Sequence, residues 1–273
     1  MIRLGFSPCP NDTFIFYALA NKKIDTRGLD FELFIEDVET LNTHAIKRTL
    51  DVTKISSHAY YHLQKDYRFL RSGGALGRGC GPLIVARDSK KFFSGNPADQ
   101  LKIAVPGRLT TAFLLLRLYF ASNVDLNLSN FVVMPFHEIM QAVSAGTADA
   151  GLIIHESRFT YRQHGLAKII DLGEWWEKET GLPIPLGGII AKRSLGEPVI
   201  ATIEDLIKSS VQYALEHRDE AMPSIKRYAQ ELSDEVIMNH IALYVNDYTL
   251  DIGDEGAAAL EELLKRAHGL PPV

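Results

Sequence analysis

Cysteine is scarce in this chain of 273 residues, which contains only Cys9 and Cys80, and neither belongs to a CxxC pair. Two such cysteines cannot build a disulfide framework or one of the common zinc-binding patterns. We therefore expect no metal site, and we interpret both residues as reduced thiols of a cytoplasmic protein.

Long hydrophobic runs and an excess of positive charge are also missing. No stretch approaches the roughly 18 apolar residues of a membrane span. The opening MIRLGFSPCPND lacks the long apolar region of a signal peptide. The formal net charge of -5 gives no electrostatic footprint for nucleic acid or for a membrane surface. We therefore expect neither nucleic acid nor a membrane as a partner.

The residues that are present suit a soluble globular protein with a large core. Hydrophobic residues make up 46% of the chain and charged residues 23%, which is typical of that class. A chain of this length can form two domains of ordinary size.

The stretch AGLIIHESRFTY, residues 150–161, changes character abruptly at its middle. Residues 151–154 are apolar and rich in β-branched side chains, which predicts a buried strand of a parallel sheet. In open α/β sheets, ligands bind beyond the carboxyl ends of the strands, and His155 lies there. Because the unperturbed pKa of histidine is about 6.5, His155 is a candidate general base. A purely structural role at a strand end is the commoner role of a lone histidine.

Short apolar runs predict three strands in the first part of the chain, over residues 2–6, 30–35 and 52–56. After the first strand comes the turn SPCPND, and Asn11 or Asp12 at its end, or Thr13 directly after it, can cap a helix over residues 14–20. The free N–H groups at a helix start favour an anionic ligand, although a well-capped tight turn explains the same residues.

Two serines, Ser56 and Ser57, end the third predicted strand. They can cap a helix over residues 59–64 and present hydroxyl groups to the same crevice as the first turn.

Five glycines follow within the eleven residues SGGALGRGCGP. Their spacing matches neither the Walker nor the Rossmann motif, and an apolar strand over residues 83–86 follows instead of a helix. We therefore do not interpret this stretch as a nucleotide-binding loop. We expect either a close approach of the backbone to a ligand or a hinge-like connection.

The strand–turn–helix pattern starts again in KIAVPGRLTTAFLLLRLY, where residues 102–105 predict a strand. Thr110 or Thr111 would cap the helix that follows, which makes a second candidate anion site facing the first. Residues 131–134 and 136–145 predict a further strand and helix.

Two strand–helix units, two crossings and a helical tail together predict the fold class. It is α/β, with the two-lobed architecture of type II periplasmic binding proteins, a ligand cleft between the lobes and a helical C-terminal segment. We expect residues 1–90 and 189–273 to form a discontinuous first lobe and residues 91–188 an inserted second lobe. The polar residues 89–100 suit a crossing, and closure around the ligand is the expected motion. Fold alone leaves function open.

Seven segments of the chain together resemble one enzyme family, and they are GFSPCPNDTFIFYAL, EDVETLN, TKIS, LRSGGALGRGCGPLIVAR, VPGRLTTAFLLL, AGLIIHESRFTY and QELSDEV. They follow the order of 1,4-dihydroxy-6-naphthoate synthase, which belongs to the futalosine route to menaquinone (vitamin K2). The resemblance implies a lyase with a periplasmic-binding-protein-like fold. It would convert cyclic dehypoxanthine futalosine into 1,4-dihydroxy-6-naphthoate by base-assisted elimination and release the sugar-derived fragment.

The resemblance also implies roles for individual residues. The histidine of the IIHE segment, His155, matches the proton acceptor of the family. The substrate-binding positions that we expect from the other segments are Lys54, Ile55, Ser56, Thr110, Thr111, Ser7, Asn11, Thr13 and Gly74. The resemblance implies no cofactor, and it implies a small-molecule substrate that carries a carboxylate and sugar-derived hydroxyls.

Three other functions stay open at this point. A solute receptor would share the fold, but the missing export signal counts against it. Chorismate dehydratase of the same pathway also shares the fold, although the SPCPND and IIHESRFTY segments favour the synthase. A ligand-sensing regulator would need a DNA-binding segment, which the chain does not offer. The sequence also leaves open whether the chain forms a homodimer, and whether Glu156 orients His155.

Overall fold

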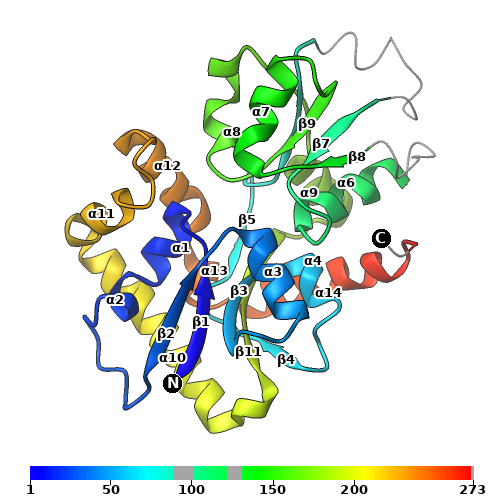
Figure 1. The fold of residues 1–273 in the computed structure, drawn as a ribbon. Coiled ribbons are helices and arrows are strands. Elements are labelled where there is room, and N and C mark those ends of the chain that lie inside the picture. The colour runs from blue at the N-terminus through cyan, green and yellow to red at the C-terminus, as the bar shows by residue number, and fades with distance from the viewer. Residues whose placement is uncertain (89–100, 122–130, 272–273) are drawn as a thin grey trace. The chain divides into compact units, whose positions relative to one another are not determined.

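The computed structural model describes residues 1–88, 101–121 and 131–271. The chain divides into two compact units. The first comprises Met1–Gly77 and Pro185–Leu264, and the second comprises Arg78–Ile184 and Lys265–Val273. Each unit contains one β-sheet with helices packed on it (Figure 1).

The sheet of the first unit has the strand order β2-β1-β3-β11-β4. Its members are β1 (Ile2–Phe6), β2 (Phe31–Ile35), β3 (Val52–Ser56), β4 (Tyr67–Phe69), β5 (Ala75–Gly77), which pairs with β11 off this path, and β11 (Ile184–Lys192). β1 runs parallel to β2 and β3, whereas β11 runs antiparallel to β3 and β4. The turns that follow β1 and β3 therefore lie at the same edge of this sheet.

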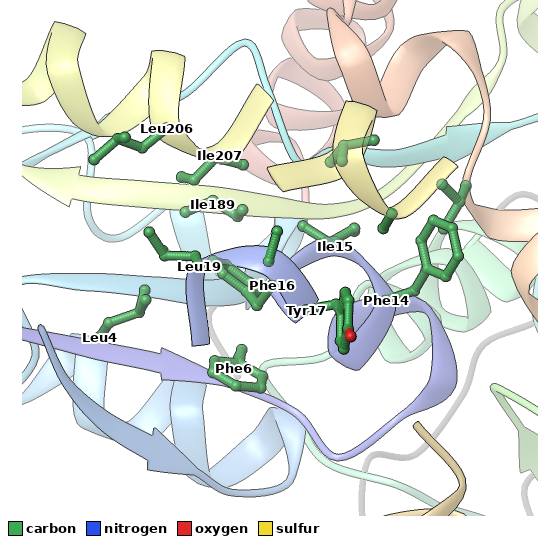
Figure 2. Packing of buried hydrophobic residues seen from close by; sticks show 14 of the residues in the cluster. Leu4, Phe6, Phe14, Ile15, Phe16, Tyr17, Leu19, Ile189, Leu206 and Ile207 are labelled. Carbon is green, nitrogen blue, oxygen red and sulfur yellow. The ribbon is translucent and has the colours of Figure 1, made fainter. Parts of the chain in front are cut away.

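Three helices cover one face of this sheet, and they are α1 (Pro10–Ile15), α2 (Tyr17–Ala20) and α10 (Glu197–Glu216). Figure 2 shows the apolar side chains that fill the space between them and the strands. The rings of Phe6 on β1 and Phe16 stack with their centroids 4.7 Å apart, and Ile189 of β11 packs with Ile207 of α10. Each such burial stabilises the fold by about 1.5–3 kcal/mol, so this core holds α1 at the sheet edge.

The other face of the first sheet is covered by α3 (Val38–Ile46), α4 (Ser57–Tyr60) and α14 (Gly253–His268). Their apolar side chains form one core cluster with residues of the sheet, and it contains Ala45, Ile55, Tyr60, Leu63, Tyr67, Ile190 and Leu260. The remaining helices of the first unit are α11 (Arg218–Lys226), α12 (Asp234–Tyr244), α13 (Asp247–Leu250) and the 3-10 helix Arg193–Leu195.

The sheet of the second unit has the strand order β10-β6-β9-β7-β8. Its strands are β6 (Leu83–Ala86), β7 (Ile103–Val105), β8 (Phe131–Val133), β9 (Ala150–Ile153) and β10 (Ala167–Asp171). β7 runs parallel to β8 and β9, whereas β6 runs antiparallel to β9 and β10. The prediction of a parallel sheet around β9 is therefore correct on its β7 side and wrong on its β6 side, because β6 runs in the reverse direction.

Among the described residues between Arg78 and Ile184, the helices of the second unit are α6 (Thr111–Ala121), α7 (Phe136–Ser144), α8 (Ser157–Thr160), the 3-10 helix Tyr161–His164 and α9 (Leu172–Thr180). α7 packs Ile139 and Val143 against Gly151 of β9, and both side chains belong to the same core cluster as Leu83 of β6. α9 buries Trp176 completely, and the indole N–H of Trp176 donates a hydrogen bond to the carbonyl of Pro183 over 3.0 Å.

The predicted start and caps of the first helix are wrong. α1 begins at Pro10 with Cys9 as its N-cap, and no side chain caps it. Asn11, Asp12 and Thr13 lie inside its first turn instead. Proline is favoured at that position because its fixed φ suits a helix and its missing N–H has no partner there anyway.

Other local details also differ from expectation. The helix after β3 covers Ser57–Tyr60 rather than residues 59–64. β6 lies in the second unit, not with residues 1–77, because its neighbours in the sheet are β9 and β10. The predicted crossing at residues 89–100 lies outside the described residues. Over the described ranges, no helix is long and apolar enough to cross a membrane.

Candidate functional site

A buried carboxylate, Asp12, organises the polar groups at the edge of the first sheet. Its Oδ1 accepts a hydrogen bond from Lys54 Nζ over 2.8 Å, and its Oδ2 accepts one from the Ser7 hydroxyl over 2.7 Å. The side chains of Lys54 and Asp12 are only 6% and 3% exposed. Buried charges are tolerated when each is paired and hydrogen-bonded. The turn after β1 is thereby tied to β3, as the predicted meeting of these strand ends requires.

Asn11 extends this network to the C-terminal helices. Its amide Nδ2 donates to Asp12 Oδ1 over 2.8 Å, and its Oδ1 lies 2.9 Å from Nε2 of His240 on α12. Because an amide oxygen only accepts, Nε2 of His240 carries the proton of this bond. His240 is fully buried, and its ring centroid lies 4.6 Å from that of Tyr244. A residue far along the chain therefore orients the Asn11 amide.

Ser56 is held at the end of β3 by Asn42 of α3. The main-chain N–H of Ser56 donates to Asn42 Oδ1 over 2.9 Å, and Asn42 Nδ2 donates to the Ser56 hydroxyl over 3.1 Å. Ser56 occupies the N-cap of α4, but its side chain makes no capping hydrogen bond. The hydroxyl of Ser57 is buried and has no hydrogen-bond partner among the described residues. Since an unsatisfied buried hydroxyl costs free energy, Ser57 is a candidate for contact with a polar ligand group.

Three of the expected substrate-binding residues are explained by local folding. The Thr13 hydroxyl donates to the carbonyl one turn earlier in α1 over 3.0 Å. The Ile55 side chain is fully buried in the core cluster under α3 and α4. A Cβ at Gly74 would lie 2.7 Å from Leu76 and 2.9 Å from Ile252, so close packing explains the glycine.

His155 lies two residues after the end of β9, and its backbone is left-handed, with φ of 56°. This conformation costs a residue with a Cβ about 1–2 kcal/mol, and such strain concentrates at functional sites. The side chain is half-buried, and its ring centroid lies 5.2 Å from that of Phe136 at the start of α7. A strand end does not require a strained histidine, so the geometry supports a functional role.

Glu156 lies beside His155. One of its carboxylate oxygens lies within 4.8 Å of a ring nitrogen of His155. The carboxylate does not cap α8, and its Oε2 accepts no hydrogen bond from the described residues. The two side chains are therefore a candidate acid–base pair.

The helix α6 has the threonine cap that the sequence predicts. The Thr110 hydroxyl accepts the main-chain N–H of Phe113 over 3.2 Å and donates to the Gly107 carbonyl over 2.8 Å, so Thr110 caps the helix that begins at Thr111. β7 precedes this helix and runs parallel to β9. The helix start and His155 therefore lie at the same edge of the second sheet, where the N–H groups of the first turn suit an anion.

Sequence reasoning missed Asn42 and His240, and it gave Asp12 only a capping role. His240 had a signal, because it interrupts the apolar stripe that Ile237 and Tyr244 form on α12. The pairing of Asp12 with Lys54 had none, because 42 positions separate the two residues.

Solved structures with low sequence identity share this fold. A Candida albicans protein described as having the generic periplasmic binding protein fold gives a TM-score of 0.70 at 16% identity, over 100% of this chain and 92% of that one. The periplasmic aliphatic sulphonate binding protein of Escherichia coli gives 0.65 at 13% identity, over 98% and 86%. The chain therefore has the α/β fold of periplasmic binding proteins, which confirms the predicted fold class.

Sequence comparisons are more specific. A family described as menaquinone biosynthesis matches residues 2–269. Proteins named 1,4-dihydroxy-6-naphthoate synthase from Thermus thermophilus and Streptomyces coelicolor are 49% and 44% identical, over 97% and 100% of this chain and 93% and 95% of their own lengths. A crystal structure from Archaeoglobus fulgidus is 40% identical, with a TM-score of 0.89 over 98% of this chain and 97% of that one. The chain belongs to the menaquinone biosynthesis family, as an enzyme of that pathway.

Proposed function

We propose that the chain catalyses the reaction for which its relatives are named, the formation of 1,4-dihydroxy-6-naphthoate. The observation that carries the proposal is the identity of 49% and 44% to two such synthases over nearly the whole chain. The proposed substrate is cyclic dehypoxanthine futalosine, and the proposed reaction class is that of a lyase that needs no cofactor.

His155 is the general base of the proposed reaction. Forming an aromatic ring from the cyclic precursor requires removal of a proton next to a carbonyl. His155 takes the proton, the electron pair of that C–H bond forms the new ring double bond, and the sugar-derived fragment leaves with the electron pair of the bond that breaks. A positioned base contributes about 10²- to 10⁴-fold in rate. The strained turn at His155, beyond the end of β9, supports this role.

Each unit, taken by itself, offers groups that suit a part of the proposed substrate. In the second unit, the N–H groups at the start of α6 suit the substrate carboxylate, and Thr110 shapes that helix start through its cap. In the first unit, Ser7 and Ser56 retain hydrogen-bonding capacity for sugar-derived hydroxyls. Lys54 is already bonded to Asp12, so we assign it to holding the first turn rather than to neutralising the substrate carboxylate.

The proposal includes a cytoplasmic location and a small molecule as the partner. Its support is that the relatives are named as biosynthetic enzymes rather than as exported receptors. Fractionation of cells that express the chain tests the location, and recovery of the protein outside the cytoplasm would contradict it.

Mass spectrometry of the purified protein incubated with cyclic dehypoxanthine futalosine tests the reaction. We expect the wild type to release the naphthoate and His155→Ala to be slower by about 100-fold or more. His137→Ala is the matched control, because His137 lies in the same unit with its side chain 67% exposed. It should retain the wild-type rate.

Each other outcome has a definite meaning. A wild-type protein that binds the compound and returns it intact is a receptor, and one that converts chorismate instead is the related dehydratase. A folded His155→Ala protein with the wild-type rate would remove the histidine from the mechanism while leaving the family membership in place.

A further inference from the structure

Arg158 lies three residues after His155, and both ends of its guanidinium are bonded within the second unit. Nη1 donates to the carbonyl of Gly81 over 2.6 Å, and Nη2 donates to Asp171 Oδ2 over 2.7 Å. The side chains of Arg158 and Asp171 are 17% and 1% exposed. Because the guanidinium group is planar and rigid, two such bonds fix its direction as well as its distance.

Asp171 is itself held in place by the start of α9. Its Oδ1 accepts the main-chain N–H groups of Gly173 over 3.0 Å and Glu174 over 3.2 Å, so it caps this helix. The helix is anchored in turn by the buried Trp176. The Asp171 carboxylate is therefore a fixed point of the second unit.

The Gly81 carbonyl is a second fixed point. A Cβ on Gly81 would lie 2.3 Å from the Cα of Gly173, and a Cβ on Gly173 would lie 2.7 Å from the Cα of Gly81. The two backbones can therefore approach this closely only because both residues are glycine. The main-chain N–H of Leu172 also donates to the Pro82 carbonyl over 3.0 Å. This contact places the Gly81 carbonyl where Arg158 reaches it.

The short helix α8 connects these fixed points to His155. The main-chain N–H of Arg158 donates to the His155 carbonyl over 3.3 Å, and that of Phe159 donates to the Glu156 carbonyl over 2.9 Å. The first turn of α8 therefore begins at the histidine. A strained backbone persists only where its surroundings over-determine it. β9 restrains His155 from the preceding side, and Arg158 restrains it from the following side.

We propose that Arg158 and Asp171 are positioning residues for His155, and that their ion pair holds the left-handed turn and with it the direction of the imidazole. The inference rests on the proposed function of His155. Neither side chain needs to touch the substrate. The pair acts by keeping the base where the proton is removed, and a misplacement of about 1 Å can lower a rate by about 100-fold.

Kinetics of the naphthoate-forming reaction test this proposal with Arg158→Ala. We expect kcat to fall by about 100-fold while KM stays close to the wild-type value. Added guanidinium ion should restore part of kcat, because it can occupy the space between Asp171 and the Gly81 carbonyl. Arg162→Ala is the matched control, since Arg162 is exposed in the next turn and contacts Tyr161. It should neither lose activity nor respond to guanidinium.

A second variant guards against a failure of Arg158→Ala to fold. Asp171→Asn keeps an oxygen that can cap α9 but removes the negative charge, so a loss of kcat in this variant reflects the ion pair. NMR of ¹⁵N-labelled histidine gives a readout other than activity. The ring resonance of His155, assigned with His155→Gln, should move in the Arg158 and Asp171 variants and stay in place in Arg162→Ala.

Folded variants with wild-type kcat and an unchanged His155 resonance would overturn the proposal. A lower melting temperature with an unchanged kcat per folded molecule would also overturn it, because such a result indicates a structural role alone. If the wild type forms no naphthoate, the proposed function fails, and the ring resonance still shows whether Arg158 controls His155.

Discussion

Lys54 Nζ lies 2.8 Å from Asp12 Oδ1, and solvent is almost completely excluded from both side chains. The pair joins β3 to the first turn of α1, and Asp12 also receives hydrogen bonds from Ser7 and Asn11. Within the first unit, two of the predicted substrate-binding side chains, Ser7 and Asn11, therefore depend on one buried carboxylate.

Lys54→Met should destabilise the protein strongly. It leaves Asp12 as an uncompensated buried charge, which costs about 3–5 kcal/mol. Urea unfolding measures the change, and Arg27→Met is the control. Arg27 pairs with Asp205 at 3.1 Å while both side chains are at least half exposed, so that loss should stay within about 1 kcal/mol. Equal losses in the two variants would contradict the importance of burial for this pair. Replacing Asp12 by Asn together with Lys54→Met should recover part of the loss.

In an ordinary helix an alanine variant is more stable than a glycine variant, and the left-handed backbone at His155 should reverse that order of stability. At φ of 56°, glycine avoids the Cβ strain, so we expect His155→Gly to be more stable than His155→Ala by about 0.5–1 kcal/mol. Denaturant unfolding of both variants measures this difference. At Glu174 in α9, an exposed helical position, alanine should instead be more stable than glycine by about 1 kcal/mol. The same order at both positions would show that residue 155 is not strained.

Asp51 links β1 to β11 and makes stability depend on pH. Burial by itself would raise the pKa of Asp51, but hydrogen bonds from Lys192 Nζ over 2.8 Å and from the Arg3 N–H over 2.9 Å outweigh it, so the pKa lies below its ordinary value. A carboxyl group whose pKa is lowered by folding stabilises the protein above its unfolded-state pKa. That stabilisation is lost as the pH falls through the folded-state pKa.

Asp51→Asn should therefore lower the free energy of unfolding at neutral pH, and the difference from the wild type should shrink as the pH falls below 3.8, the ordinary value. Chemical unfolding at a series of pH values measures this dependence. Glu32→Gln, at an exposed position of β2, should leave the pH dependence of the free energy of unfolding unchanged. A constant difference at all pH values would rule out the ionised carboxylate as the cause.

The thiol of Cys80 should be unreactive in the folded protein. Burial raises the pKa of Cys80 to about 12, and the thiolate is the form that reacts. In a Cys9→Ser variant, titration with a disulfide reagent at pH 8 should detect no thiol before unfolding and one thiol in urea. Rapid reaction of the native protein would show that the glycine-rich stretch opens to solvent.

Local structure was predictable wherever a short pattern determines it. The short apolar runs at 2–6 and 52–56 predicted β1 and β3 with their correct bounds, because strand preference depends on the side chains within the run. The capping role of Thr110 was predictable for the same reason, since a cap involves residues three apart. The first helix was placed too late because Pro10 was read as part of a turn, although proline also suits the first position of a helix.

By itself, the sequence determined the fold class, the family and the position of His155 after a buried strand, because these depend on local patterns and on the order of long segments. Only the tertiary structure decided the reversed direction of β6, the pairing of Lys54 with Asp12 and of Arg158 with Asp171, and the left-handed backbone of His155. Those features join residues that are distant in the chain or depend on the strain that the surrounding packing imposes, and a local pattern carries no information about either.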